Sequence, residues 1–226
     1  MNRRSTLAAA ALISAFAQAA PANALAIFDP KGDFLASHAG PSAGDLDIEV
    51  AEVILHEDRI FFGGALFGDV RTTPGATYVW GIDRGAGSAG LFGGTPPVGP
   101  GVTFDAVLAV KADRTGTLMV FNEIGAPTVT NLTENVFAFE TLVGAIVTKD
   151  LLPSRGFAFE DYRYNFWTRS GSGNPGIADL ALDRGTFAAV PEPQSWALMI
   201  AGFGLAGWRA RRSSETSRRQ LRSAAA

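Results

Sequence analysis

Carboxylate side chains at short spacings are the first residues of this chain that could do chemistry. Asp45, Asp47 and Glu49 alternate with apolar residues, and Asp29 lies four residues before Asp33. Carboxylate oxygens are the ligands that hard cations such as Ca²⁺ prefer. Calcium loops usually also gather Gly and Asn in a turn, and a solvated strand face explains the alternation equally well. We therefore expect no cofactor, with Ca²⁺ at either group as the alternative.

A glycine motif follows at residues 85–90, where the order of residues matches the dinucleotide fingerprint G-x-G-x-x-G. That fingerprint works only when a helix follows, because the amides of the helix N-terminus bind the pyrophosphate. Residues 91–97 contain two glycines and two prolines and cannot begin a helix. The sequence therefore predicts a loop between strands and no nucleotide site.

Aromatic residues offer a third kind of chemistry, since flat rings can stack on sugars. The candidates for glycan binding are Trp80, Tyr162, Tyr164 and Trp167. Rings that alternate along a strand usually point into the core, and their large area dominates the free energy of burial. We favour a core role for these four residues and keep a glycan-binding surface as the alternative.

Catalytic motifs are missing from the sequence. The chain has no cysteine, only two histidines, no G-x-S-x-G and no H-E-x-x-H. Glycoside hydrolysis needs two carboxylates across a cleft, and the many acidic residues single out no pair. We expect a protein that is not an enzyme, with a hydrolase that uses other carboxylates as an alternative.

Short strands must position all of these groups. Segments rich in β-branched and aromatic residues alternate with Gly, Pro, Asn and Asp clusters, and no long helical periodicity or internal repeat interrupts them. This spacing predicts an all-β fold, an antiparallel β-sandwich or jelly-roll-like domain over residues 27–188. The predicted strands cover residues 45–50, 60–62, 77–82, 103–111, 117–121, 135–139, 142–148 and 162–166.

Charge separates the middle of the chain from its ends. Residues 27–190 hold 11 of the 19 Lys and Arg residues and 20 of the 22 Asp and Glu residues, a net charge of −9. A protein that binds nucleic acid needs the opposite sign. We therefore expect no nucleic-acid partner.

The N-terminal segment is typical of a secretory signal peptide. A start with two arginines leads into an apolar core over residues 7–17, which is too short for a membrane span of about 20 residues. Small residues at Ala24 and Ala26 suit a signal peptidase, so we place cleavage after Ala26, with 22–24 as the nearby alternative. We expect residues 1–26 to form a signal helix that engages the secretion machinery, and we leave them out of the fold.

The C-terminal segment has three parts: a short motif, an apolar run and a basic cluster. The apolar run covers residues 196–208, and Ser213 to Ala226 adds a polar tail with more arginines. Residues 194–208 span roughly 21 Å as a helix at about 1.5 Å per residue. This length is shorter than a bilayer core of about 30 Å, so we expect a short transmembrane helix with its arginines on the cytoplasmic side. The motif is Pro191, Glu192 and Pro193, and the basic stop is Arg209, Arg211 and Arg212.

This arrangement resembles the PEP-CTERM sorting signal of Gram-negative bacteria. The resemblance implies export, retention in the inner membrane by the C-terminal helix and processing by an exosortase at or near the motif. It also implies release to the cell surface or to an exopolysaccharide matrix. The extra tail after the basic cluster departs from the family pattern.

Together these observations predict four segments: a signal peptide (1–26), a β-sandwich (27–188), a sorting and anchor segment (189–212) and a basic cytoplasmic tail (213–226). The middle domain resembles other exported bacterial β-sandwiches over a short stretch, residues 78–87. We expect a non-enzymatic protein of the cell envelope or its polysaccharide matrix. A module that binds polysaccharide is the first alternative, and a secreted hydrolase is the second.

Overall fold

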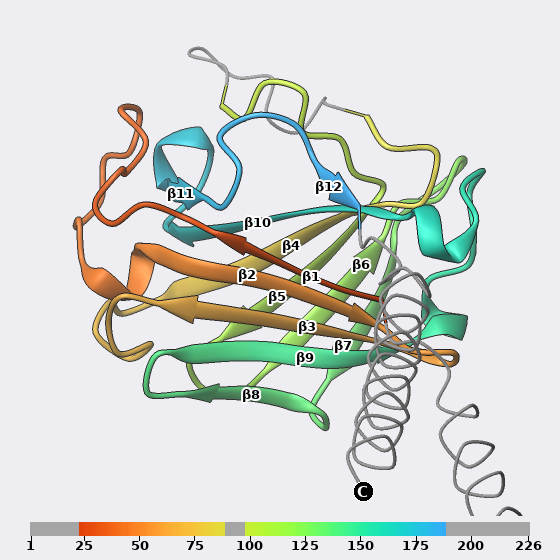
Figure 1. Cartoon of the computed structure of the whole chain (residues 1–226), viewed down its shortest axis with the longest axis horizontal. Helices are drawn as coiled ribbons and strands as arrows, with labels where there is room; N and C mark the ends of the chain where they lie inside the picture. Colours follow the sequence, from red (N-terminus) through yellow and green to blue (C-terminus); the bar gives the residue numbers. More distant parts are fainter. Residues whose placement is uncertain (1–22, 89–97, 189–226) are drawn as a thin grey trace, which may run out of the picture. The chain divides into compact units, whose positions relative to one another are not determined.

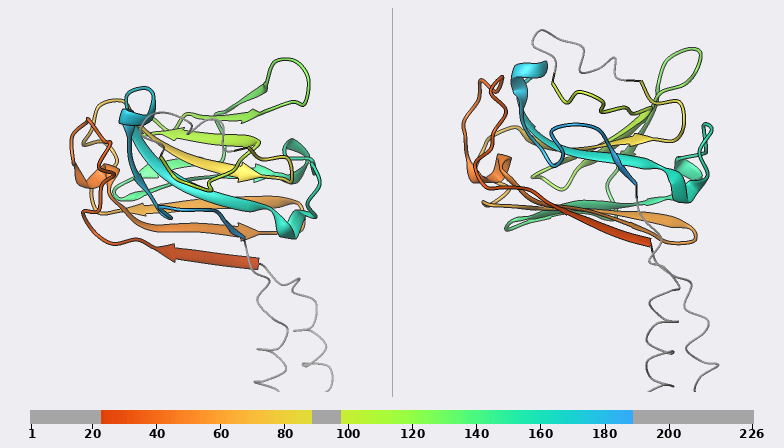
Figure 2. Two further views of the ribbon diagram at one scale, coloured as in Figure 1. Left: turned by 90° about the horizontal axis from the view of Figure 1, so that it is seen from above. Right: turned by 45° about the horizontal axis from the view of Figure 1, so that its top comes forward.

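Two antiparallel β-sheets form the domain in the computed structural model, which describes residues 23–88 and 98–188 (Figure 1). Figure 2 shows the two layers from above and from an oblique side. The all-β, antiparallel prediction is therefore confirmed. Within the described residues no helix is long and apolar enough to cross a membrane.

The first sheet has five strands in the order β1-β2-β3-β9-β8. The pairs β1–β2, β2–β3 and β8–β9 join strands that follow one another in sequence. The pair β3–β9 joins strands that are distant in sequence. The strands are β1 (Asn23–Phe28), β2 (Ile48–Leu55), β3 (Arg59–Leu66), β8 (Val136–Phe139) and β9 (Leu142–Thr148).

The second sheet has seven strands in the order β11-β10-β4-β5-β6-β7, with β12 paired beside β10. Short 3₁₀ turns lie in the connections between strands, at 44–46 (β1 to β2), at 149–151 and 159–161 (β9 to β10) and at 174–176 (β10 to β11). The strands are β4 (Ala76–Asp83), β5 (Ala106–Lys111), β6 (Gly116–Val120), β7 (Thr128–Leu132), β10 (Arg163–Ser170), β11 (Ile177–Leu180) and β12 (Phe187–Ala188).

The core lies between the facing sides of the two sheets. Period-two alternation puts Phe62 of β3 and Trp80 of β4 on these inner sides, where both are fully buried. The Trp80 ring stacks on Phe166 of β10 with 4.4 Å between ring centroids, and Phe62 tilts against Trp80 at 6.1 Å. Burial of such rings is the main source of stabilisation between the layers.

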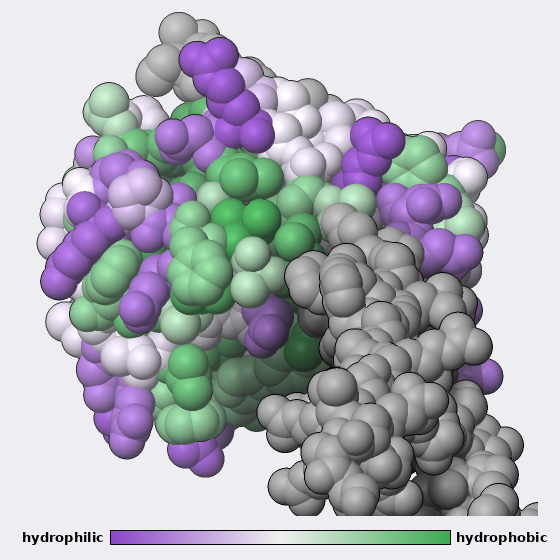
Figure 3. Space-filling view, viewed as in Figure 1, coloured by the Kyte–Doolittle hydropathy of each residue, from purple (hydrophilic) through white to green (hydrophobic). Residues whose placement is uncertain are grey.

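The outer side of the five-stranded sheet is unusually apolar for a surface. Figure 3 shows apolar side chains gathered over it. Phe28 is 80% exposed, Phe139 is 45% exposed and Leu142 is 39% exposed.

The predicted signal helix over residues 1–26 is wrong at its C-terminal end, because residues 23–26 belong to β1. Residues 1–22 and the predicted transmembrane helix lie outside the described residues. The chain divides into the unit Met1–Pro191, which contains the sandwich, and the unit Glu192–Ala226.

Candidate functional site

Asp29 and Asp33, which are close in sequence, meet the distant Asp179 at one end of the sandwich. Asp29 directly follows β1, and its amide donates a hydrogen bond to the Glu49 carbonyl at 3.1 Å. Asp33 lies in the loop that follows, and Asp179 lies on β11 of the other sheet. One carboxylate oxygen of each residue lies within 4.8 Å of the others. The sequence suggested Asp29 and Asp33 together, but it did not suggest Asp179.

The loop that carries Asp33 is held by two contacts. Gly32 has φ +84°, a left-handed conformation that favours glycine, and its amide donates to both oxygens of Asp47 at 3.0 and 3.1 Å. The Leu35 amide donates to the Ala178 carbonyl at 2.9 Å, which joins the loop to β11. These contacts place Asp33 beside Asp179 without any bond from its own side chain.

Asp179 is buried, with 1% of its surface exposed. Its Oδ2 accepts a hydrogen bond from the Ile48 amide, and its Oδ1 accepts one from the Leu180 amide, each at 2.8 Å. The first of these bonds links the two sheets. The one signal in the sequence for this position was an aspartate within the otherwise apolar run Ile177–Leu180, because aspartate is rarely found among apolar residues unless it has partners.

The electrostatics of this group are dominated by burial and by mutual repulsion. Burial and the carboxylates of Asp179 and Asp33 raise the pKa of Asp29 to about 8. Burial also raises the pKa of Asp179 to about 6, although its amide donors act in the opposite direction. Burial raises the pKa of Asp47, opposed by the amide of Gly32. The group therefore favours either protons or a bound cation.

The carboxylates of Asp45, Asp47 and Glu49 do not share one strand face. The predicted strand over residues 45–50 is confirmed for residues 48–50, which begin β2, and is wrong before them, because residues 44–46 form a 3₁₀ turn. Asp45 is fully buried and accepts hydrogen bonds from the Thr73 amide and hydroxyl at 2.7 and 2.8 Å. Asp45 and Asp47 are thus internal acceptors for backbone amides, and only Glu49 of this group is exposed.

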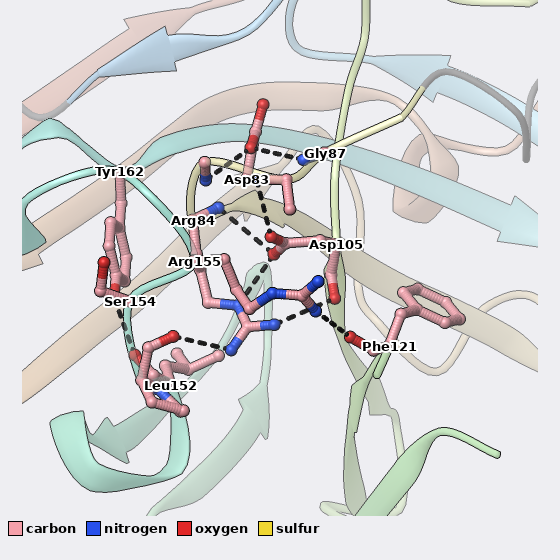
Figure 4. A network of polar contacts seen from close by, with 12 residues as sticks. Asp83, Arg84, Gly87, Asp105, Phe121, Leu152, Ser154, Arg155 and Tyr162 are labelled. Atoms are coloured by element: carbon pink, nitrogen blue, oxygen red, sulfur yellow. Dashed lines mark hydrogen bonds and ion pairs between the residues drawn. The ribbon is translucent and has the colours of Figure 1, made fainter. Parts of the chain in front are cut away.

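A second polar network lies at the opposite end of β4, and Figure 4 shows its members. Arg84 is fully buried and its Nε donates to Asp105 Oδ1 at 2.8 Å. Its Nη1 donates to the Pro153 carbonyl at 2.8 Å. Arg155, in the loop after the 3₁₀ turn at 149–151, donates through Nη1 to the Phe121 carbonyl at 2.8 Å.

The glycine motif belongs to this network. The amides of Gly85 and Gly87 both donate to Asp83 Oδ1 at 2.9 Å, and the Ala86 amide donates to Asp105 Oδ2 at 3.2 Å. A Cβ at Gly87 would clash with the Asp83 carboxylate. The loop does cradle an anion with its amides, but the anions are carboxylates of this chain. The amides that a pyrophosphate would use are therefore occupied.

The four predicted glycan-binding residues do not form one surface. Trp80 and Tyr164 are fully buried, and Tyr162 is 1% exposed. Trp167 points to the outer side of the seven-stranded sheet and lines a cavity of about 390 Å³, but only 4% of its surface is exposed. None of these rings therefore offers an open face to a sugar.

Two other rings lie on the apolar outer side of the five-stranded sheet. Phe61 of β3 and Phe137 of β8 are nearly parallel, with centroids 5.8 Å apart and an interplanar angle of 16°. Beneath them Gly63 pairs with Gly144, and a Cβ at either glycine would clash with one of the rings. Together with Glu52 the rings line a shallow groove of about 190 Å³. Sequence reasoning missed this groove because neither ring follows an obvious motif.

Of the predicted processing residues, the structure describes only those of the predicted signal cleavage site. Pro191, Glu192 and Pro193 lie outside the described residues, as do the arginines at 209, 211 and 212. Ala26 lies in β1, where its backbone pairs with Glu52 of β2, and Ala24 pairs with Ile54. The predicted cleavage after Ala26 thus falls inside a strand and stays a prediction.

Fold and site together define an acidic two-sheet β domain with a group of carboxylates, in part buried, at each end of its central strands. Comparison with known families adds the sorting signal: the PEP-CTERM protein-sorting motif matches residues 189–213. The chain therefore carries the sorting signal that its C-terminal residues resemble, which marks an exported protein that an exosortase sorts. No curated protein and no solved structure is significantly similar to the chain.

Proposed function

We propose that this protein is a non-enzymatic component of the cell envelope or its exopolysaccharide matrix, held in the inner membrane until an exosortase processes it. The observation that carries this proposal is the sorting motif at residues 189–213. The signal peptidase, the secretion machinery and the exosortase are its partners during export. The acidic β-sandwich is the part that acts after release, and its net charge is compatible with a soluble matrix component.

The sorting motif gives the direct test of this proposal. In a host that has an exosortase, replacing Pro191→Ala together with Glu192→Ala should leave the protein full length in the membrane, as seen by blotting of cell fractions. The matched control is Pro127→Ala with Glu134→Ala, two exposed residues of the sandwich. This control should be processed as the wild type is. Normal processing of the motif variant would contradict the proposal.

Binding to polysaccharide is a second candidate function, and the groove at Phe61 and Phe137 favours it. Two nearly parallel rings on a glycine floor provide a flat apolar surface, and Glu52 provides acceptors for hydroxyl groups. Here the candidate residues differ from those that the sequence suggested, because Trp80, Tyr162 and Tyr164 are buried.

A pull-down with insoluble polysaccharides tests this candidate. Phe61→Ala or Phe137→Ala should weaken retention roughly 2- to 12-fold, given about 0.5–1.5 kcal/mol for a ring contact. Ile124→Ala, which changes an apolar residue that is 91% exposed elsewhere, should not weaken it. Equal retention of all three variants, or none by the wild type, would remove the glycan function and leave the sorting proposal intact. Screening the same preparations for polysaccharide hydrolysis tests the expectation that the protein is not an enzyme.

A further inference from the structure

One carboxylate lies among apolar side chains in the groove at Phe61 and Phe137. Glu52 of β2 is half-buried and pairs across the sheet with Ala26 on one side and Gly63 on the other. The other residues that line the groove carry no charge: Val50, Phe61, Gly63, Gly64, Ala65, Phe137 and Leu142. Within the described residues, no cationic group pairs with Glu52 and no group donates a hydrogen bond to its side chain. Glu52 is therefore the one charge that a ligand in this groove would meet.

The pairing register puts Glu52 at one end of the groove. Glu52, Gly63, Gly144 and Phe137 are successive partners in one row across β2, β3, β9 and β8. Three strand spacings of about 4.8 Å separate the first and last backbone positions of this row by about 14 Å. The two glycines between them have no side chain, so the space above them is left to Glu52 and to the two rings.

The carboxylate and the Phe61 ring meet above Gly63. A Cβ at Gly63 would lie 2.8 Å from Phe61 Cε1 and 3.5 Å from Glu52 Oε2, so both groups lie over the same glycine. A Cβ at Gly144 would clash with Phe137 Cζ in the same way. The rings thus lie across the glycine pair, with the carboxylate beside them. A sugar ring that stacks on Phe61 carries the substituents of its edge next to this carboxylate.

The charge of Glu52 decides which substituent the groove favours. A ligand that covers the rings takes water away from the carboxylate, and an unpaired charge that loses water costs free energy. A hydroxyl group replaces part of that hydration, whereas a protonated amino group donates hydrogen bonds and also cancels the charge. A sugar carboxylate would be repelled by Glu52 and by the net charge of −9 over residues 27–190. The groove therefore favours a cationic sugar over a neutral one and disfavours an acidic one.

The size of the groove indicates a polymer that is bound through one unit. Its volume of about 190 Å³ is smaller than the roughly 300–1,000 Å³ of pockets that enclose drug-sized ligands. A stable protein partner would have to cover about 800 Å² of this chain. A second copy would also bring a second Glu52 and a second acidic domain to the same interface. A chain of cationic sugars meets no such repulsion.

We propose that the groove binds an amino-sugar polysaccharide, with a sugar ring stacked on Phe61 and Phe137 and its protonated amino group paired with Glu52. Glycan binding at this groove is the second candidate function above, on which this proposal rests, and Glu52 adds the class of glycan. The two rings provide contact area for any pyranose, and the carboxylate provides the selectivity for positive charge.

Retention of the full chain, purified in detergent, on three kinds of polysaccharide bead tests this proposal. Chitosan carries free amino groups, chitin carries the same sugar with its amino groups acetylated, and alginate carries carboxylates. A weakly acidic buffer keeps the amino groups of chitosan protonated. The wild type should be retained roughly 5- to 10-fold more strongly on chitosan than on chitin, between the effect of an exposed ion pair and that of a buried charged hydrogen bond. It should not be retained on alginate.

Glu52→Gln keeps the shape of the side chain and removes its charge. This variant should lose the preference for chitosan and bind chitin as the wild type does. The matched control is Glu57→Gln, which removes an exposed charge between β2 and β3 and lowers non-specific attraction to chitosan by the same single charge. This control should keep the preference. Phe61→Ala should weaken retention on both chitosan and chitin.

Equal retention of the wild type on chitosan and chitin would overturn the proposal, and so would an equal loss on chitosan in Glu52→Gln and Glu57→Gln. In either case a loss in Phe61→Ala would still support glycan binding at the groove. Retention on none of the three materials would overturn both the proposal and the glycan function. Self-association of the wild type that Phe61→Ala abolishes would show that a second copy occupies the groove, and would overturn the proposal as well.

Discussion

Two groups of carboxylates in this domain, each with a buried aspartate, are stabilised in opposite ways. Asp105 is 4% exposed and faces the fully buried guanidinium of Arg84. Asp179 is 1% exposed, yet its nearest charged neighbours are other carboxylates. The first group is complete within the chain, and the second lacks a positive charge. Burial alone therefore does not tell whether an acidic residue is structural; its partners do.

The difference is also visible in how backbone amides are used. The amides of the glycine loop donate to Asp83 and Asp105, and Asp105 also accepts a hydrogen bond from Arg84. Amides also reach Asp179, but none reaches Asp29 Oδ2 within the described ranges. Amide donors stabilise a carboxylate only in part when other carboxylates lie close to it.

Removing Arg84 should produce the largest effect. It tests the group in which the buried carboxylate has a positive partner. Arg84→Met leaves the Asp105 carboxylate buried without its cation, so we expect a loss of about 3–5 kcal/mol in the free energy of unfolding, measured with urea. Arg59→Met is the control, because its ion pair with Asp58 is exposed and its loss should leave the free energy of unfolding nearly unchanged. A loss below 1 kcal/mol for Arg84→Met would mean that the buried pair does not stabilise the fold.

A smaller effect is expected for the group that lacks a positive charge. Here the change of stability with pH tests the comparison. The pKa of Asp29 is raised to about 8 from 3.8. Between these pH values the folded chain holds a proton that the unfolded chain has lost, so stability falls as pH rises from about 4 to about 8. With chelator present, Asp29→Asn should remove much of this fall and gain on the order of 1 kcal/mol at pH 8.5, because partial exposure screens the repulsion.

Melting curves between pH 5 and 9 measure this effect. Asp58→Asn is the control, since the Arg59 guanidinium lowers the pKa of Asp58. Its carboxylate stabilises the fold above the unfolded pKa, so this variant should gain nothing at high pH. Parallel curves for the wild type and Asp29→Asn would show that the Asp29 carboxylate is not repelled by its neighbours.

Local sequence patterns predicted the strands well where one face is buried. The predicted strand over residues 142–148 matches β9, and the predicted strand at residues 77–82 lies within β4. Period-two alternation decides these segments because a shift of one residue would expose the buried face. The edge strand β7 was missed, since three of its five residues are exposed and no buried face marks it.

The candidate sites were harder to predict because their partners are distant in sequence. Asp45 and Asp47 looked like an open strand face, but they accept bonds from Thr73 and Gly32, residues 28 and 15 positions away. Asp179 binds the amide of Ile48, 131 residues away. Only the packing of the two sheets brings such groups together. The sorting motif needs no such packing, and the sequence alone was enough to find it.

The register of β1 bears on where the predicted signal peptide can be cleaved. Six residues, Asn23–Phe28, pair with β2, and a cut after Ala26 would discard four of them. Proteases bind their substrates as free, extended chain, so a peptide bond already held in a sheet edge is shielded from them. A cut after Ala26 must therefore precede folding, and it leaves the edge of the sheet with a two-residue stub ahead of Asp29. A cut ahead of Asn23 imposes no such order of events and delivers the edge strand intact.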